Sequence, residues 1–170
     1  MRIGGLITLL VLVLAAMTSA QTTASFQDVP PWHWAYEAVR TGASAGIFVG
    51  SPADDREMAV NAIVQIYDSF AHAADPAAGE WVERFLINLS ANWPEPLRRS
   101  RLQRFRVDGV RVEGSGDRLT VAFVATISLR SASGVADSRA SIRADVRRDS
   151  EGRWKVNYAS LAEEQPQLFK

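Results

Sequence analysis

The chain has 170 residues, with 19 Lys or Arg balanced by 19 Asp or Glu, and no Cys. The lack of cysteine excludes disulfides, thiolate metal sites and a lipid-modified N-terminal cysteine. The charge is uneven, because residues 21 to 97 hold three Arg against ten acids, whereas residues 98 to 170 hold fifteen Arg or Lys against nine acids. The two halves could attract each other within or between molecules, or the basic half could meet a polyanion.

Residues 1 to 20 have the pattern of a secretory signal peptide. Arg2 precedes an apolar run over residues 6 to 17, and small residues follow at positions 18 to 20. The run is short for a membrane span, so we expect it to be cleaved and the mature chain to be exported, meeting the membrane only through this signal. Export, together with the lack of a recognised nucleic-acid motif, predicts no nucleic-acid partner.

The next stretch predicts two helices joined by a glycine-containing elbow. A Pro-Pro pair suits the first turn of a helix over about residues 32 to 45, with Trp34 on its apolar face. Gly46 is expected to end this helix, because glycine reaches the left-handed conformation without a Cβ clash.

The second helix is predicted over about residues 54 to 72. Asp54 is expected to accept the free N–H groups of its first turn, while Glu57 closes a capping box. Six residues at helical spacing give its buried stripe, namely Ala59, Ala62, Ile63, Ile66, Tyr67 and Phe70.

Residues 26 to 73 resemble one shortened copy of an S-layer homology domain. The residues that carry this resemblance are, in order, Phe26, Asp28, Val29, Pro30, His33, Trp34, Ala35, Tyr36, Ala45, Gly46, Ile47, Gly50, Glu57, Met58 and Ala59. The resemblance implies binding to an anionic cell-wall polysaccharide, aided by an arginine in the turn before the second helix.

Asp55 stands at the position of that arginine in the present chain. Arg56 beside it is the residue left to take the role, and Trp32 is the candidate for stacking on a sugar ring, since Trp34 is expected in the core. The alternative interpretation is that the motif serves only as a helix-capping scaffold, because resemblance in fold does not carry function.

A third helix is predicted over about residues 77 to 91, with Trp81, Phe85 and Leu89 on its apolar face. From Arg98 onward the apolar period changes to two, which predicts an antiparallel meander. Its four strands are expected at residues 102 to 112, 119 to 129, 139 to 147 and 153 to 158. One face of this sheet is apolar, and we expect the helices to cover it.

The first strand changes the parity of its apolar residues across Asp108 and Gly109. This change indicates either a β-bulge or a tight turn, and we favour the bulge. The arginines of the last two strands are most simply a solvated face.

The helices and the bent meander over about residues 54 to 162 resemble the cone fold of the nuclear transport factor two, ketosteroid isomerase and scytalone dehydratase superfamily. The most suggestive piece is the strand Gly152-Arg153-Trp154-Lys155-Val156 with Tyr158 after it, although a cystatin-like sheet can carry the same pattern. The resemblance implies a pocket, for which the candidate lining residues are Tyr67, His72, Phe85, Phe123 and Tyr158.

Catalytic members of that superfamily hold a buried Asp, His or Tyr in the cone to move protons. The candidates here are Tyr67, Asp68, His72 and Tyr158, which match no member's spacing, so no catalytic residue is predicted. His33 and His72 are the only histidines and lie far apart, so no metal site is predicted, and no motif indicates a cofactor.

The sequence therefore predicts an α+β protein with a signal peptide at 1 to 20, an S-layer-homology-like helical segment at 26 to 73, and a helix-plus-sheet domain at 76 to 165. The helix at 54 to 72 would belong to both parts. We interpret the chain as an exported non-catalytic protein held at the cell envelope by wall polysaccharide or another envelope protein. The alternative is a periplasmic small-molecule-binding or enzymatic cone, which a large apolar pocket would favour.

Overall fold

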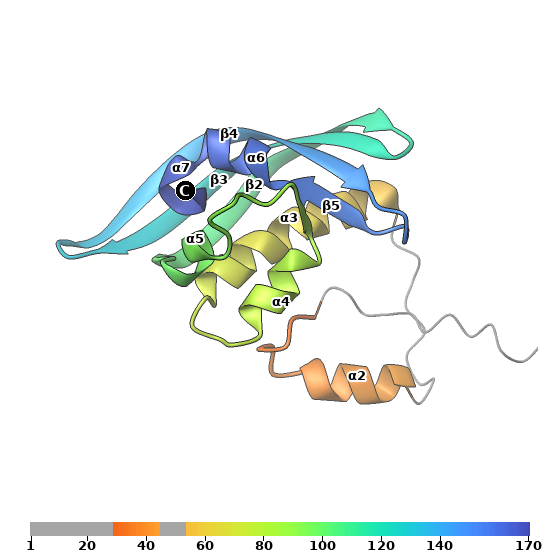
Figure 1. Ribbon diagram of the computed structural model, residues 1–170, viewed down its shortest axis with the longest axis horizontal. Helices are drawn as coiled ribbons and strands as arrows, with labels where there is room; N and C mark the ends of the chain where they lie inside the picture. The colour runs from red at the N-terminus through yellow and green to blue at the C-terminus, as the bar shows by residue number, and fades with distance from the viewer. Residues whose placement is uncertain (1–28, 45–53) are drawn as a thin grey trace, which may run out of the picture.

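The computed structural model describes residues 29 to 44 and 54 to 170, and this part of the chain combines helices with a single twisted sheet (Figure 1). The α+β class is therefore confirmed. The helices are α2 (Tyr36–Ser44), α3 (Asp55–Ala71), α4 (Ala78–Glu83), α5 (Glu95–Arg98), α6 (Tyr158–Glu164) and α7 (Pro166–Phe169). The strands are β1 (Leu86–Ile87), β2 (Leu102–Ser115), β3 (Arg118–Ser131), β4 (Gly134–Arg148) and β5 (Trp154–Asn157), in the spatial order β1-β5-β4-β3-β2.

Helix α3 runs beneath the sheet and has the predicted bounds to within a residue at each end (Figure 1). The Asp54 carboxylate accepts hydrogen bonds from the backbone N–H groups of Arg56 and Glu57, at 2.7 and 2.9 Å. All six residues of the predicted stripe are buried, none more than 1% exposed. The predicted cap and apolar face of this helix are thus confirmed, and the reciprocal bond from the Glu57 side chain stays a prediction.

Strands β2, β3, β4 and β5 form the predicted antiparallel meander. Alternate residues of β3 and β4 are buried against the helices, namely Leu119, Val121, Phe123, Ala125, Ile127, Ile142, Ala144 and Val146. The register between β2 and β3 shifts between Asp108 and Arg111, and Gly109 has a φ of 61°. The favoured β-bulge is confirmed, with glycine at the left-handed position that such a bulge requires.

The third helix is shorter than predicted and ends at Glu83. Leu86 and Ile87 instead form β1, which pairs in parallel with Val156 and Asn157 of β5. The prediction of helix up to residue 91 was wrong because backbone pairing with a distant strand outweighs the local helical pattern. The sheet therefore has a fifth strand that the sequence pattern did not indicate.

The first described helix begins later than predicted, at Tyr36 instead of residue 32. Two successive turns precede it, with His33 N–H donating to the Pro30 carbonyl and Tyr36 N–H to the His33 carbonyl, both at 2.9 Å. Trp34 lies in these turns and is 91% exposed, so its predicted place in the core was wrong. Gly46, the predicted helix end, lies outside the described residues.

The chain continues past β5 into two short helices that were not predicted. Tyr158 was expected in the last strand, but it begins α6 after Asn157, whose side chain accepts the Ala159 N–H at 3.3 Å. Helix α7 then brings Leu168 and Phe169 inside the molecule, where they are 4% and 1% exposed. The C-terminal residues therefore complete the core between α3 and the sheet.

Candidate functional site

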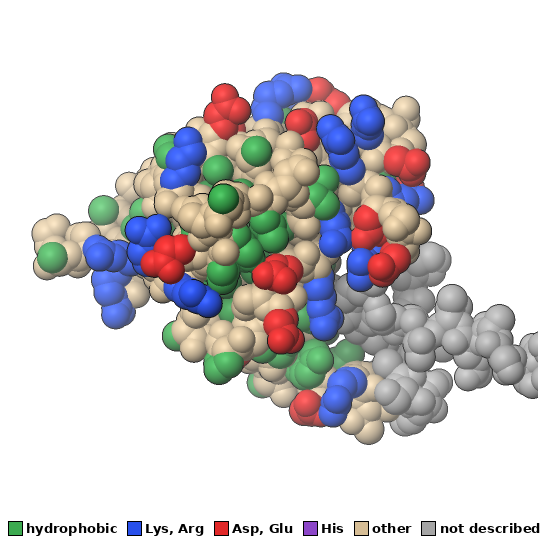
Figure 2. Space-filling view, viewed as in Figure 1, with side chains coloured by type: hydrophobic (Ala, Val, Ile, Leu, Met, Phe, Trp, Pro, Cys, Tyr) green, Lys and Arg blue, Asp and Glu red, His purple; other side chains and the backbone are tan. Residues whose placement is uncertain are grey.

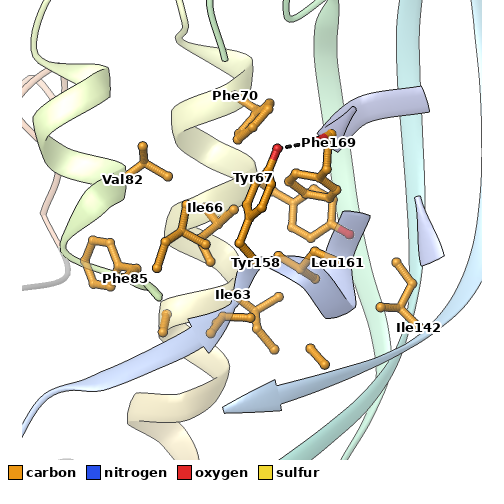
Figure 3. Close-up of a cluster of buried hydrophobic side chains, with 14 of the residues drawn as sticks. Ile63, Ile66, Tyr67, Phe70, Val82, Phe85, Ile142, Tyr158, Leu161 and Phe169 are labelled. Atoms are coloured by element: carbon orange, nitrogen blue, oxygen red, sulfur yellow. Dashed lines mark hydrogen bonds between the residues drawn. The ribbon is translucent and has the colours of Figure 1, made fainter. Parts of the chain in front are cut away.

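The interior between the helices and the sheet is the first candidate, because the resemblance to the cone fold implies a pocket there. Figure 3 shows side chains from α3, α4, α6 and α7 converging on this space. The ring of Phe169 lies at its centre, with centroids 4.9 Å from Phe70, 5.7 Å from Tyr67 and 6.1 Å from Tyr158. Phe169, next to the C-terminus, is thus part of the packed core.

The polar groups of this interior are few and are neutral. The Tyr67 hydroxyl donates to Oε1 of Gln165 at 2.7 Å, and the Tyr158 hydroxyl donates to the Phe169 carbonyl oxygen (dashed line in Figure 3). Gln165 is fully buried, and its Nε2 has no hydrogen-bond partner. Burial raises the pKa of Tyr67 far above its ordinary value. Burial also raises the pKa of Tyr158, against a smaller lowering by a hydrogen bond with Ser90.

The structure brings together only some of the predicted pocket residues. Phe123 packs edge-on against Tyr67 at 6.2 Å, and Tyr158 lies in the same cluster. Phe85 is buried in the same core, with its ring 5.7 Å from that of Trp81. His72 does not join them, because it lies at the end of α3 with its side chain 48% exposed.

The residues of the cluster that sequence reasoning missed are Gln165 and Phe169. Both follow the last predicted strand in a stretch too short to show an apolar period. The only available signal was the pair Leu168-Phe169 near the end of the sequence.

Trp32, the predicted sugar-stacking residue, packs against α3. Its Nε1 donates to Oδ2 of Asp68 at 2.8 Å, and its ring stacks on His72 with centroids 5.2 Å apart. The edge of Trp81 lies 6.3 Å from the same ring. One face and the polar edge of the indole are therefore occupied, and Trp32 fastens the first described segment to the body.

The turn before α3 is also tied to the sheet. Asp55 forms an ion pair with Arg148 of β4 and accepts a hydrogen bond from Trp154 Nε1 at 3.3 Å. These contacts give the acid at position 55 a structural role. Arg56 is exposed, and the structure gives its side chain no ion pair within the described ranges.

No group of three or more His, Asp or Glu within residues 29 to 44 and 54 to 170 is arranged to hold a metal ion. In the same part of the chain, no helix combines the length and apolar character needed to cross a membrane.

No family model matches the sequence, and no curated protein matches it either. Similar solved structures include a protein of Shewanella frigidimarina described provisionally as a ketosteroid isomerase, 15% identical, with a TM-score of 0.44 over 58% of this chain and 90% of that one. The CaMKII association domain of C. elegans is 16% identical, with a TM-score of 0.40 over 61% of this chain and 95% of that one. The S. rosetta CaMKII hub is 16% identical, with a TM-score of 0.40 over 64% of this chain and 94% of that one. These are partial likenesses in fold alone.

Proposed function

We propose that this chain is an exported, non-catalytic protein of the bacterial cell envelope, held there by its S-layer-homology-like segment. The observation that supports a non-catalytic role most directly is the filled interior, with Phe169 against Tyr67 and Tyr158. A side chain that packs on three aromatic rings contributes to the core in the way that a bound ligand otherwise would. The interior then has a structural role, and we expect the functional contacts to be made by exposed side chains.

The chemistry of the buried groups supports the same proposal. Within the described ranges, the buried polar side chains are those of Gln65, Ser69 and Gln165. An amide or a hydroxyl of this kind does not change its protonation state near neutral pH, as a general acid or base must do. The two buried tyrosines have raised pKa values and keep their protons.

We assign attachment to exposed side chains of the S-layer-homology-like segment. Trp34 is 91% exposed, and its only aromatic neighbour in the described structure is His33, with ring centroids 5.6 Å apart. An exposed indole offers a flat apolar face on which a sugar ring can stack. Arg56, exposed at the first turn of α3, supplies a guanidinium that can bind a carboxylate or phosphate on the polymer.

The test is co-sedimentation of the mature chain, residues 21 to 170, with purified cell-wall sacculi before and after removal of their secondary polymers. We expect binding that depends on those polymers and falls at least tenfold in Trp34→Ala and in Arg56→Ala. The matched control is Arg98→Ala, an exposed arginine on α5. Equal loss in all three variants, or no binding to any wall preparation, would contradict the proposal.

The alternative, a small-molecule-binding or enzymatic cone, has its own readout. Apolar carbonyl compounds can be screened by thermal unfolding of the intact chain. A compound that displaces Phe169 and binds in its place should raise the Tm. A dose-dependent rise of several degrees that disappears in Tyr67→Phe would favour the alternative.

A further inference from the structure

The face of the sheet that points away from α3 carries rows of arginines. The strand register places Arg106 of β2 and Arg139 of β4 on either side of Thr126. It also places Arg111 and Arg143 on either side of Ala122, and Arg118 beside Arg147. We call these residues with Arg104 the arginine face, whose members are Arg104, Arg106, Arg111, Arg118, Arg139, Arg143 and Arg147.

The arginine face borders a long, narrow strip of β3, which we call the lane. Successive rows lie four residues apart on β3, or about 13 Å at the usual rise of a strand, so three rows span about 27 Å. The arginines of β2 and those of β4 lie two strand spacings apart, or about 10 Å. Beyond Arg118, the residues of β3 on this face are small and partly buried, namely Thr120, Ala122, Val124, Thr126 and Ser128. Lys or Arg side chains and Asp or Glu side chains are interspersed along the upper rim of the molecule in Figure 2, where the sheet lies in Figure 1.

Two of these guanidinium groups form ion pairs within the part of the chain that the structure describes. Arg106 pairs with Asp108 at 2.6 Å, and Arg143 pairs with Glu113 across the lane at 3.1 Å. The other five members of the arginine face are exposed and form no ion pair with any residue of the described ranges. The acids Asp108, Glu113, Asp137 and Asp145 lie on the same outward face. Seven arginines against these four acids leave a net charge of +3, which an anion bound between the rows would reduce.

The choice of arginine also indicates recognition. Of the fifteen basic residues from 98 to 170, thirteen are Arg and only two are Lys. Either residue would serve to solvate a sheet, and a lysine is sufficient as a point charge. The planar fork of arginine matches carboxylate and phosphate groups with paired hydrogen bonds, so this bias favours binding of such groups.

The side chains between the arginines narrow the class of partner. Single-stranded nucleic acids are bound by aromatic side chains on which the bases stack, and the strand residues that face outward in the register include none. Tight protein partners need large buried anchors, mostly aromatic residues, which are also lacking at these positions. The hydroxyl groups of Thr120 and Thr126 suit the hydroxyl groups of sugars instead, whereas the Ser128 hydroxyl already donates to Asp137 at 2.6 Å.

We propose that the arginine face binds an extended polysaccharide bearing carboxylate or phosphate groups, which lies along β3 with its charges between the two rows. The polymer displaces Glu113 from Arg143 where that pair crosses the lane. This deepens the proposed envelope function and rests on it for the class of polymer, and it adds a second contact, on the sheet, to the contact made by the helical segment.

The test uses the mature chain with polygalacturonate and phosphomannan of similar length, and uncharged dextran as a reference, measured by titration calorimetry across a salt series. The double variant Arg139→Gln/Arg147→Gln should bind the charged polymers at least tenfold more weakly, with a shallower salt dependence. The control Arg98→Gln/Arg101→Gln removes the same charge from exposed positions outside the face and should change binding less than twofold.

Several outcomes would overturn the inference. They are no binding by the unsubstituted chain, equal loss in both double variants, or tighter binding of single-stranded DNA than of either polymer. A shift in mass by sedimentation equilibrium that only the face variant abolishes would assign the face to a second copy of the chain. The sacculus assay separates this inference from the envelope proposal. If binding is kept in Arg139→Gln/Arg147→Gln but lost in Trp34→Ala, the inference about the arginine face is wrong and the envelope proposal stands.

Discussion

Asp55 at the start of α3 and Arg148 at the end of β4 form an ion pair that joins the main helix to the sheet. The Arg148 guanidinium also lies 5.0 Å above the ring of Trp154, whose Nε1 donates to the same carboxylate. The three side chains form one connected unit between residues almost a hundred positions apart. Asp55 therefore has a structural role in joining α3 to the sheet.

Substitution of Asp55 should destabilise the fold modestly. Both side chains are partly exposed, so we expect Asp55→Asn to lower the free energy of unfolding by about 1 kcal/mol, and Asp55→Arg to lower it further through repulsion with Arg148. The charge exchange Asp55→Arg/Arg148→Asp should recover part of this loss. Urea unfolding of the unsubstituted chain, Asp55→Arg, Arg148→Asp and the double variant measures the coupling, and purely additive effects would mean that the pair contributes nothing.

Phe169 should be a major contributor to stability in spite of its place next to the C-terminus. It is 1% exposed and packs against Phe70, Tyr67 and Tyr158. Phe169→Ala should lower the free energy of unfolding by about 3 kcal/mol through lost burial and an unfilled cavity. Lys170→Ala is the matched control, because that residue is exposed. A midpoint in urea that is the same for both variants would show that the C-terminal helix is not part of the cooperative core.

The parts of the fold that the sequence predicts correctly are those in which one period is sustained. Helix α3 has a capping aspartate and six apolar residues at helical spacing, and β3 alternates from Leu119 to Ile127. In both cases the local preference and the tertiary contacts agree. The sequence also predicts the bulge at Gly109, because the apolar residues of β2 change parity beside this glycine.

The parts that the sequence does not predict depend on contacts between distant segments. Strand β1 has two residues and no period of its own, and it exists because Val156 N–H donates to the Phe85 carbonyl at 2.7 Å. The exchange of roles between Trp32 and Trp34 is decided by Asp68, which lies 36 residues from Trp32. Alternation places the arginines on a solvated face, but only the register between strands brings Arg106 and Arg139 level with one another.

Alkaline pH should weaken the fold through Tyr67. Burial raises its pKa above the ordinary value of 10.0, so above pH 10 the unfolded chain releases a proton that the folded chain retains. The stability contributed by the neutral group is complete below pH 10 and is lost as the pH rises above it, by about 1.4 kcal/mol per pH unit. Tyr67→Phe should remove this part of the slope in urea unfolding between pH 9 and 12, while Tyr36→Phe on α2 should keep it.

At neutral pH the same substitution should have a separate cost. Tyr67→Phe leaves both polar atoms of the buried Gln165 amide without a partner, and an unsatisfied buried group costs about 1 to 3 kcal/mol. The double substitution Tyr67→Phe/Gln165→Leu should recover stability at pH 7, because it removes the orphaned amide. No recovery would mean that packing, and not the hydrogen bond, decides the effect.

Trp32 and Trp34 provide a matched pair that tests how the N-terminal segment is held. Trp32→Ala removes the hydrogen bond to Asp68 and the stacking on His72, so residues 29 to 44 should exchange amide hydrogens faster and be cut sooner by protease. Trp34→Ala removes an indole that is 91% exposed, and it should change neither measurement while abolishing sacculus binding. If Trp34→Ala accelerates exchange and Trp32→Ala does not, the anchoring roles assigned to the two indoles are reversed. If Trp32→Ala also weakens wall binding while α3 stays protected, the segment must be docked on the body in order to bind.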